Sequence, residues 1–304
     1  MLEIAIMIEG QNGLNWPRWQ ALVRLVEELG FSGLYRSDHF TNARPPALDS
    51  LELWVALTWL AANTSRIEFG PLVTPFSFRH PAHTARMAAA VDDLSGGRLT
   101  LGLGAGWEEL EHHMFGFDLL DMRGRFARFQ EGLECVTRLL RSSEPVTFDG
   151  RFYQLDEAQV LPPPHRPGGP RILVGGNGFR RTLPLVARYA DEWNANFIGP
   201  QEFEKANKEL DRLLAEAGRP ASSVRRSLMT GCMFAKDADG LAQKLAERGR
   251  TREQLREWNE LVGAGQEIKG QLQQLSEAGV QRVMLQWLDL DDLEGLRELA
   301  KVVL

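Results

Sequence analysis

Short apolar runs alternate with amphipathic segments along almost the whole chain. Residues 3–10, EIAIMIEG, suit a strand, whereas residues 17–30, PRWQALVRLVEELG, repeat apolar side chains at helical spacing between a proline and a glycine. The same pattern predicts strands at residues 3–10, 33–39, 67–75, 98–107, 171–176, 192–197, 225–235 and 281–288. It predicts helices at residues 17–30, 49–64, 80–97, 123–141, 180–189 and 201–217, within 239–278, and at the end of the chain.

The alternation is interrupted between the fourth helix and the fifth strand. Residues 145–170 contain Asp149-Gly150, a strong hairpin turn signal, between two β-prone runs, and then a proline-rich connector. We therefore expect an inserted hairpin after the fourth strand–helix pair and a helical insertion before the eighth strand.

Eight strand–helix pairs predict a parallel α/β fold, and eight is the number that closes a (β/α)8 TIM barrel. An open doubly wound sheet is the alternative, but it would usually carry a GxGxxG turn after its first strand. Residues 8–15, IEGQNGLN, do not match that turn. We expect one barrel domain over residues 1–304, with function at the carboxyl ends of its strands.

Composition narrows the class of protein. A chain of 304 residues with net charge −6 and 43% hydrophobic residues is ordinary for a globular protein, and it offers no basic surface for nucleic acid or an anionic membrane. Cys135 and Cys232 are isolated, and the N-terminal run lacks the pattern of a secretory leader. No apolar run approaches the ~18 residues that span a bilayer. These features predict a cytoplasmic protein.

The predicted second helix, residues 49–64, is apolar almost all round, with Asp49 or Ser50 as its expected N-cap. An outer helix of a barrel should be polar on the face that is exposed to solvent, so we expect either the inserted segment or another subunit to cover the apolar outer face of this helix. We expect a homodimer.

Reactive side chains gather where the predicted strands end. Asp38 and His39 follow the second strand, and histidine is the natural proton carrier near neutral pH, although a histidine that caps a loop is the plainer interpretation. Glu108, Glu109 and Glu111 follow the fourth strand, where they also suit the acidic first turn of a helix.

Residues 175–182, GGNGFRRT, follow the fifth strand. Glycines let backbone N–H groups approach an anion, and the next helix adds its dipole, with Arg180, Arg181 and Thr182 close by. A tight strand-to-helix turn without a ligand is the alternative. The pattern predicts a phosphate site, which is a recurrent feature late in α/β barrels.

Two further patterns concern the mouth of the barrel. Pro71, Pro75 and Pro81 interrupt the third strand, which indicates a bulged strand end. Trp107, Trp193 and Trp287 stand at strand ends, where an aromatic ring lines a pocket for a flat ligand. The histidine pairs His80/His83 and His112/His113 lack the glutamate of an HExxH motif, so we expect no metal.

In this order, five segments resemble the bacterial luciferase-like family, and most of all its branch of oxidoreductases dependent on the deazaflavin coenzyme F420. The segments are SDHF at 37–40, FGPLVTPFSFRHPA at 69–82, LSGGRLTLGLGAGWEELEHHMFG at 94–116, FDGRFYQL at 148–155 and PRILVGGNGFRRTLPLVARYADEWN at 170–194. The resemblance covers nearly the whole chain and implies an α/β barrel with an inserted segment.

The resemblance also implies roles for residues. Asp38, Thr74, Ala105 and Gly106 would lie near the deazaflavin, and His39 would exchange a proton with the substrate. The residues implied to hold the phosphate are Gly175, Gly176, Asn177 and Gly178, supplemented by Arg181 and Thr182. A non-prolyl cis peptide bond, placed by alignment at Pro71–Leu72, would lie behind the cofactor ring; a plain bulge is the alternative.

Two departures from the family pattern bear on the substrate. Dehydrogenases of the family that act on alcohols or sugar phosphates carry a tryptophan shortly after the histidine, but here Phe40, Thr41, Asn42 and Ala43 follow it. They also carry a glutamate directly after GxG of the fourth strand, where this chain has Trp107. Glu108 and Glu111 are the candidate substitutes.

Three functions follow as hypotheses. The first is an F420-dependent oxidoreductase that transfers a hydride to or from a small organic substrate. The second is a monooxygenase that uses reduced FMN and oxygen on the same fold. The third is a barrel that binds a flavin without turnover.

Overall fold

Strand β1 (Glu3–Ile8) pairs in parallel with β2 (Gly33–Arg36) on one side and with β12 (Arg282–Gln286) on the other. The other strands of this sheet are β3 (Glu68–Pro71), β4 (Thr74–Pro75), β5 (Thr100–Gly104), β8 (Arg171–Gly175), β9 (Glu192–Asn196) and β10 (Arg225–Ala235). Their order is β3-β2-β1-β12-β10-β9-β8-β5-β4, in a computed structural model that describes residues 2–304.

The third predicted strand closes this order into a barrel because it changes partner midway. Its first half, β3, pairs with β2, and its second half, β4, pairs with β5. An isolated parallel bridge between Phe69 and Leu99 joins β3 to the start of β5. The predicted TIM barrel is thus confirmed, with its third strand in two parts.

The non-prolyl cis peptide bond lies between Leu72 and Val73, one residue beyond the predicted Pro71–Leu72 position. The prediction was wrong by one residue because pairing with β2 continues further than the prolines suggest. Pro71 is still in register with Arg36, and the Leu72 N–H donates to the Arg36 carbonyl at 2.7 Å. The chain leaves β2 only after Leu72.

Glycine is required where the third and fourth predicted strands approach each other. A Cβ atom at Gly70 would stand 1.9 Å from the Thr100 carbonyl oxygen, and one at Gly102 would stand 2.1 Å from the Pro71 carbonyl oxygen. Any larger residue would force the two strands apart, so the glycines of FGP and LGLG fix the closure of the barrel.

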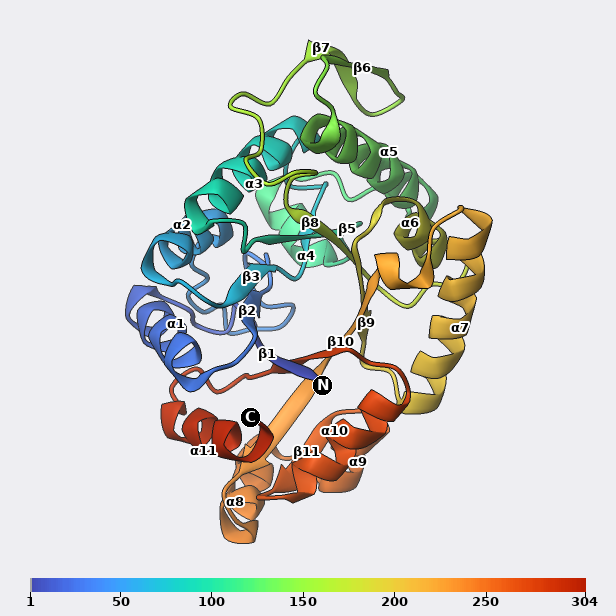
Figure 1. Ribbon diagram of the computed structural model, residues 1–304. Coiled ribbons are helices and arrows are strands. Elements are labelled where there is room, and N and C mark those ends of the chain that lie inside the picture. Colours follow the sequence, from blue (N-terminus) through green and yellow to red (C-terminus); the bar gives the residue numbers. More distant parts are fainter. Residues whose placement is uncertain (1) are drawn as a thin grey trace.

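Helices surround the strands on the outside, as the alternation predicts (Figure 1). They are α1 (Trp16–Leu29), α2 (Leu53–Asn63), α3 (Pro81–Ser95), α5 (Met122–Arg141), α6 (Thr182–Tyr189), α7 (Pro200–Glu216), α10 (Glu267–Glu277) and α11 (Leu293–Val303). The remaining helical elements lie between them: α4 (Glu109–Phe115), α8 (Ala238–Arg248), α9 (Arg252–Glu257) and the 3-10 turn η1 (Ala221–Ser223). Within residues 2–304, no helix is both long enough and apolar enough to cross a membrane.

The beginning of α2 differs from the prediction. The N-cap is Glu52, whose carboxylate accepts the Val55 N–H at 2.7 Å. Asp49 lies further back in the loop, and the Ser50 hydroxyl donates to the His39 carbonyl at 2.6 Å. The hydroxyl therefore holds the segment that carries His39 instead of capping the helix.

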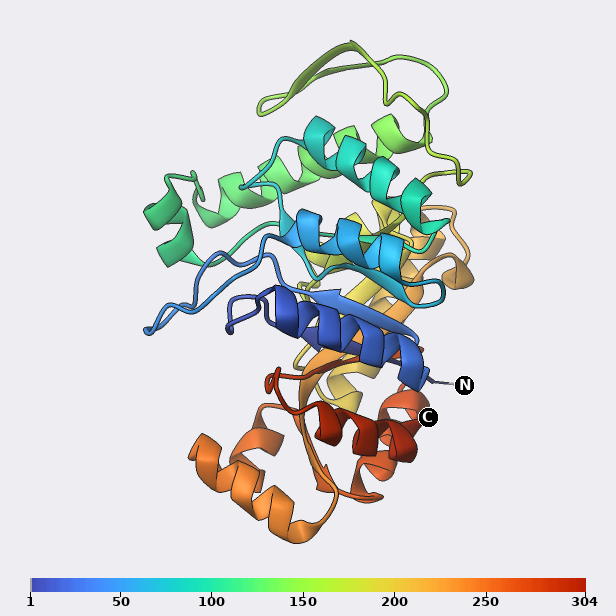
Figure 2. The ribbon, with the colours of Figure 1, turned by 90° about the vertical axis from the view of Figure 1, so that its left-hand side faces the viewer.

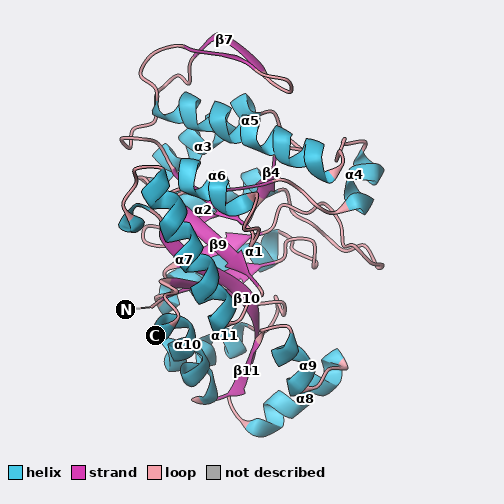
Figure 3. Cartoon of the chain, turned by 90° about the vertical axis from the view of Figure 1, so that its right-hand side faces the viewer, coloured by secondary structure: helices cyan, strands magenta, loops and turns pink. Residues whose placement is uncertain are grey.

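Two insertions project from the barrel. Strands β6 (Val146–Asp149) and β7 (Gln154–Ala158) form the predicted antiparallel hairpin, which reaches away from the helices (Figures 1 and 2). The second insertion contains α8 and α9, but also strand β11 (Leu261–Ala264), which the helical prediction missed (Figure 3). Four residues carry too little periodicity to reveal a strand, and β11 exists because it pairs with the long second half of β10.

The amino end of the barrel interior is filled by a polar network. Arg282 is buried and donates to Tyr35, Glu3 and Glu68 at 2.6, 2.8 and 2.7 Å. Burial raises the pKa of Glu192, and the nearby Arg282 charge opposes that rise. Above this layer the interior is apolar, so the barrel is a packed core up to its carboxyl end.

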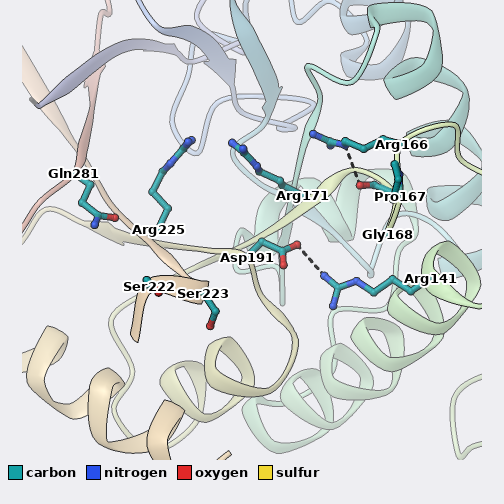
Figure 4. Close-up of a pocket in the computed structure, with 11 residues that line it drawn as sticks. Arg141, Arg166, Pro167, Gly168, Arg171, Asp191, Ser222, Ser223, Arg225 and Gln281 are labelled. Carbon is teal, nitrogen blue, oxygen red and sulfur yellow. Dashed lines mark hydrogen bonds and ion pairs between the residues drawn. The ribbon is translucent and has the colours of Figure 1, made fainter. Parts of the chain in front are cut away.

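A cavity of about 590 Å³ lies outside this amino end, lined by several arginines (Figure 4). Arg141 donates to Asp191 at 2.8 Å, while Arg171 and Arg225 reach Glu68 at 3.2 and 3.1 Å. Each of these guanidinium groups already has a carboxylate partner. The amino face of a TIM barrel usually serves stability, and this cluster fits that role.

Candidate functional site

A chamber of about 340 Å³ opens at the carboxyl end of the barrel, opposite the arginine cluster. Its walls come from the carboxyl ends of β1, β2, β3, β4, β5, β8 and β9 and the residues that follow them, and from Met229 within β10. The predicted site residues that line it are Asp38, His39, Leu72, Ala105, Gly106, Glu111, Gly175 and Gly176. Segments far apart in the sequence therefore meet where the barrel fold predicts.

His39 and Glu111 form a pair in the chamber wall. The Nδ1 atom of His39 lies 2.8 Å from one Glu111 carboxylate oxygen, and the other oxygen accepts the Phe40 N–H at 2.8 Å. The Glu111 side chain is 1% exposed, so little water competes for it. With Nδ1 bound to Glu111, Nε2 is the nitrogen of His39 that remains to exchange a proton.

Electrostatics at His39 favour its protonated form. Burial by itself lowers the pKa of His39, but the hydrogen bond and charge of Glu111 outweigh it, so the pKa is raised above its ordinary value. The ring of Trp107 stands edge-on to the imidazole with centroids 5.4 Å apart. His39 is thus a titratable side chain that one carboxylate orients and one aromatic ring flanks.

Glu108 has a different place. It is the N-cap of α4, where its carboxylate accepts the Leu110 N–H at 3.1 Å, and it is absent from the chamber lining. Of the two candidate glutamates, the structure therefore brings Glu111 and not Glu108 to His39. The reason is that Glu108 is the N-cap, whose side chain turns back onto the backbone of α4, whereas Glu111 lies within the helix and is buried against His39.

Asp38 is buried and faces a cation that the sequence analysis did not single out. Arg79 contacts both Asp38 oxygens, one of them at 3.2 Å, and also reaches Glu52 at 3.0 Å. Thr74 donates to Asp38 at 2.6 Å. Burial raises the pKa of Asp38, and Arg79 opposes that rise. Arg79 lies in a loop between a strand and a helix, where no periodic pattern marks it.

The glycine-rich segment forms another wall of the chamber. Gly176 has φ +125°, which side chains rarely adopt, and a Cβ at Gly178 would come within 3.0 Å of the Thr182 hydroxyl. The Asn177 side chain donates to the backbone and side chain of Asn196, both at 2.8 Å. This segment is therefore a rigid glycine turn tied to β9, with Asn177 itself directed away from the lining.

The amino end of α6 follows this turn directly. Arg181 stands at its N-cap position with no side-chain cap hydrogen bond. The Thr182 and Leu183 N–H groups instead donate to the Gly178 carbonyl at 2.9 and 3.0 Å, and Pro184 has no N–H, so the helix end itself offers no free donor there. Across from it, the Arg181 guanidinium lies 5.4 Å from the Phe126 ring of α5, and the neighbouring Arg125 donates to the Gly106 carbonyl at 3.3 Å. The glycine backbone and these cations suit a phosphate group.

The broken third strand forms the floor between these walls. Leu72, Val73 and Pro75 line the chamber, whereas Pro71 does not. Pro71 is held in the β3 ladder beside Gly102, and its contact with a ligand stays a prediction. Trp193 and Trp287 are also buried away from the lining, and Trp107 is the predicted tryptophan that faces it.

No metal site appears in this part of the molecule. Within the described chain, no group of three or more His, Cys, Asp or Glu side chains is arranged to hold a metal ion. The chemistry of the chamber lies in an imidazole, carboxylates, backbone amides and aromatic rings.

Comparison with known proteins gives this chamber a context. A relative from Archaeoglobus fulgidus, named 5,10-methylenetetrahydromethanopterin reductase, is 29% identical over 232 residues, which cover 76% of this chain and 65% of the relative. An F420-dependent glucose-6-phosphate dehydrogenase from Kineococcus radiotolerans is 37% identical over 174 residues, or 57% of this chain and 49% of the relative. The matches thus span only about half to two thirds of these curated relatives.

Experimentally solved structures superpose on this chain over nearly its whole length. An F420-dependent secondary alcohol dehydrogenase, in complex with an F420-acetone adduct, superposes with a TM-score of 0.85 and covers 99% of this chain and 98% of that one. At 17% identity this likeness concerns the fold alone. A family model, described as luciferase-like monooxygenase, matches residues 3–302. The chain therefore belongs to the luciferase-like monooxygenase family.

Proposed function

We propose that this protein is an oxidoreductase dependent on coenzyme F420 that transfers a hydride to or from a small organic substrate. The observation that supports this proposal best is the His39–Glu111 pair, 2.8 Å apart, in the same chamber as the glycine turn of residues 175–178. Relatives whose names include F420-dependent dehydrogenases make the deazaflavin the first cofactor to test.

The residues fit such a cofactor. The turn at Gly175 and Gly176 and the nearby Arg181 would hold its phosphate. Leu72, Val73 and Ala105 offer an apolar wall for a flat ring, and Asp38 with Thr74 offers polar contacts at its edge. When bound, the deazaflavin supplies hydride transfer.

The protein supplies the proton. His39 takes up the hydroxyl proton at Nε2 when a substrate carbinol is oxidised to a carbonyl, and returns it in the opposite direction. Glu111 holds the ring through Nδ1 and stabilises the charge that forms on it. Glu108 takes no part in this proton transfer, since it caps the amino end of α4.

Titration of the purified protein with coenzyme F420 and, separately, with FMN tests this proposal. We expect saturable binding of the deazaflavin and reduction of a carbonyl or oxidation of an alcohol that falls by at least 100-fold in the His39→Ala variant. Tight binding of FMN without binding of F420, together with oxygen consumption, would establish the monooxygenase function instead. Cofactor binding with no turnover on any substrate would favour the third hypothesis, a barrel that binds a flavin without catalysis.

The matched family is described as luciferase-like monooxygenase, and this description supports the monooxygenase alternative. The glycine turn and Arg181 would hold the phosphate of FMN equally well, so the phosphate site cannot distinguish the cofactors. The imidazole pair favours hydride transfer, because a carbonyl or carbinol needs a proton partner at the moment when the hydride moves.

We also propose that two copies associate through α1 and α2, in the cytoplasm. Val55 on α2 is 56% exposed, Trp16 on α1 is 36% exposed, and Trp16 packs edge-on against Trp59 with centroids 6.4 Å apart. Exposed aromatic and branched side chains on adjacent helices mark an interaction surface.

A further inference from the structure

We infer that the substrate of this chamber is an uncharged molecule with an aryl or bulky alkyl group next to its reacting carbon. This inference rests on the proposed function, because it takes the chamber as the place of hydride transfer. It departs from the chemistry of the sugar phosphate named for several relatives, which is a dianion.

The charges of the chamber argue against an anionic substrate. Within residues 2–304, the ionisable side chains that line it are three carboxylates and one histidine, namely Glu9, Asp38, Glu111 and His39, and neither lysine nor arginine is among them. A phosphate monoester is normally held by arginine or lysine at close range. Two arginines contact lining residues from outside the chamber, and both are engaged: Arg79 with the Asp38 carboxylate and Arg125 with the Gly106 carbonyl.

The same carboxylates do not attract a cation, because each already has a partner. Asp38 is paired with Arg79, and Glu111 is paired with His39. Glu9 accepts from the neutral amides of Gln11 and Gln286 at 2.9 and 2.7 Å, and the charges of Arg36 and His39 lie near it. An anionic substrate would lose hydration without gaining a counter-charge, and a cation would meet carboxylates that are already hydrogen-bonded, so an uncharged molecule suits the chamber best.

Aromatic rings indicate what lies next to the reacting carbon. Trp107 lines the chamber, stands against His39 and is 62% exposed, so it forms the lip beside the proton carrier. Phe78 lines the same chamber and stacks on Phe40 at 4.5 Å, and Phe40 contacts Phe115 at 5.0 Å. Aromatic rings therefore stand beside the imidazole and, through Phe40, reach α4.

Apolar side chains continue onto α4. Leu110 and Met114, one helical turn apart, are 39% and 55% exposed, and Phe115 is 53% exposed. Exposed apolar groups that adjoin a polar reaction centre are typical of a site for a substrate with an apolar body.

Calorimetric binding of three probes tests the inference: acetophenone as the uncharged aryl ketone, glucose 6-phosphate as the anion and 1-phenylethylamine as the cation. Each is titrated into the protein with and without coenzyme F420, after the binding of the coenzyme has been measured by its own fluorescence. We expect acetophenone to bind at least 10-fold more tightly than either charged probe. Tighter binding of glucose 6-phosphate or of the amine would overturn the inference.

Two variants locate the binding. Trp107→Ala should weaken acetophenone binding about 10-fold, whereas Trp258→Ala, which removes another exposed tryptophan (49% exposed) at the end of α9, should leave it unchanged. Equal effects of the two variants would overturn the assignment to the chamber. Trp107-dependent binding of acetophenone in a protein that does not bind coenzyme F420 would support the apolar chamber and refute the proposed cofactor, so the two failures are distinguishable.

Discussion

The Glu111 carboxylate joins two consecutive residues of the opposite loop: one oxygen meets His39 Nδ1 at 2.8 Å, and the other accepts the Phe40 N–H at 2.8 Å. Glu111 belongs to α4, after β5, and His39 follows β2, 72 residues earlier. One buried carboxylate thus fixes both the orientation of the imidazole and the backbone that carries it.

Replacing Glu111 by Gln should reduce kcat/KM by about 10- to 100-fold, because the amide no longer stabilises the imidazolium. The pH profile should also change, since the pKa of His39 is raised by Glu111 and falls when that charge is removed. Glu108→Gln, which keeps an oxygen at the N-cap, is the matched control and should leave both the rate and the profile unchanged. Equal losses in the two variants would remove Glu111 from its role.

The same pair predicts how folding stability depends on pH. The pKa of His39 is raised in the folded protein, so the stabilisation is full below the unfolded value of about 6.5 and disappears as pH rises through the folded pKa. We expect Glu111→Gln to reduce the free energy of unfolding by about 1–2 kcal/mol at pH 5.5, and by less at pH 9. Urea denaturation at both pH values measures this, and a loss that grows with pH would contradict it.

Gly176→Ala should weaken coenzyme binding about 10-fold, because a side chain at φ +125° strains the turn that is proposed to hold the phosphate. Gly270→Ala, at a helical position in α10 where a Cβ meets no atom within 4 Å, is the control and should not alter affinity. Fluorescence titration of the coenzyme gives both values. Unchanged affinity in Gly176→Ala would place the phosphate elsewhere.

Arg79→Met should destabilise the protein by about 3 kcal/mol, because it leaves the Asp38 carboxylate buried without its cation. Asp38→Asn in the same chain should restore much of that loss, since it removes the unpaired charge. Thermal and denaturant unfolding of the single and double variants form a cycle that measures the coupling. Additive effects of the two substitutions would show that the pair is not coupled.

Val55→Asp should convert the proposed dimer into a monomer, because a charge in the centre of an apolar contact leaves it desolvated and unpaired. Leu161→Asp, at a 67% exposed position outside α1 and α2, is the control and should not change association. Sedimentation velocity gives the mass of each variant. A wild-type monomer at micromolar concentration would refute the dimer.

Much of the site was predictable because its parts follow strands. Asp38, His39, Gly106, Gly175 and Gly176 each come soon after an apolar run, and a closed barrel brings all such positions to one end. The non-prolyl cis bond was misplaced by one residue, because the point at which a strand changes partner depends on the neighbouring strands.

The sequence by itself determined most of the elements, the eight-fold alternation and the end of the barrel at which the chamber lies, because these follow from local periodicity and from the geometry of parallel strands. Only the tertiary structure decided that Glu111 and not Glu108 meets His39, that Arg79 neutralises Asp38, and that β11 extends the second insertion. Such pairings join residues tens of positions apart, and the direction of a side chain in space is set by packing rather than by its neighbours in the chain.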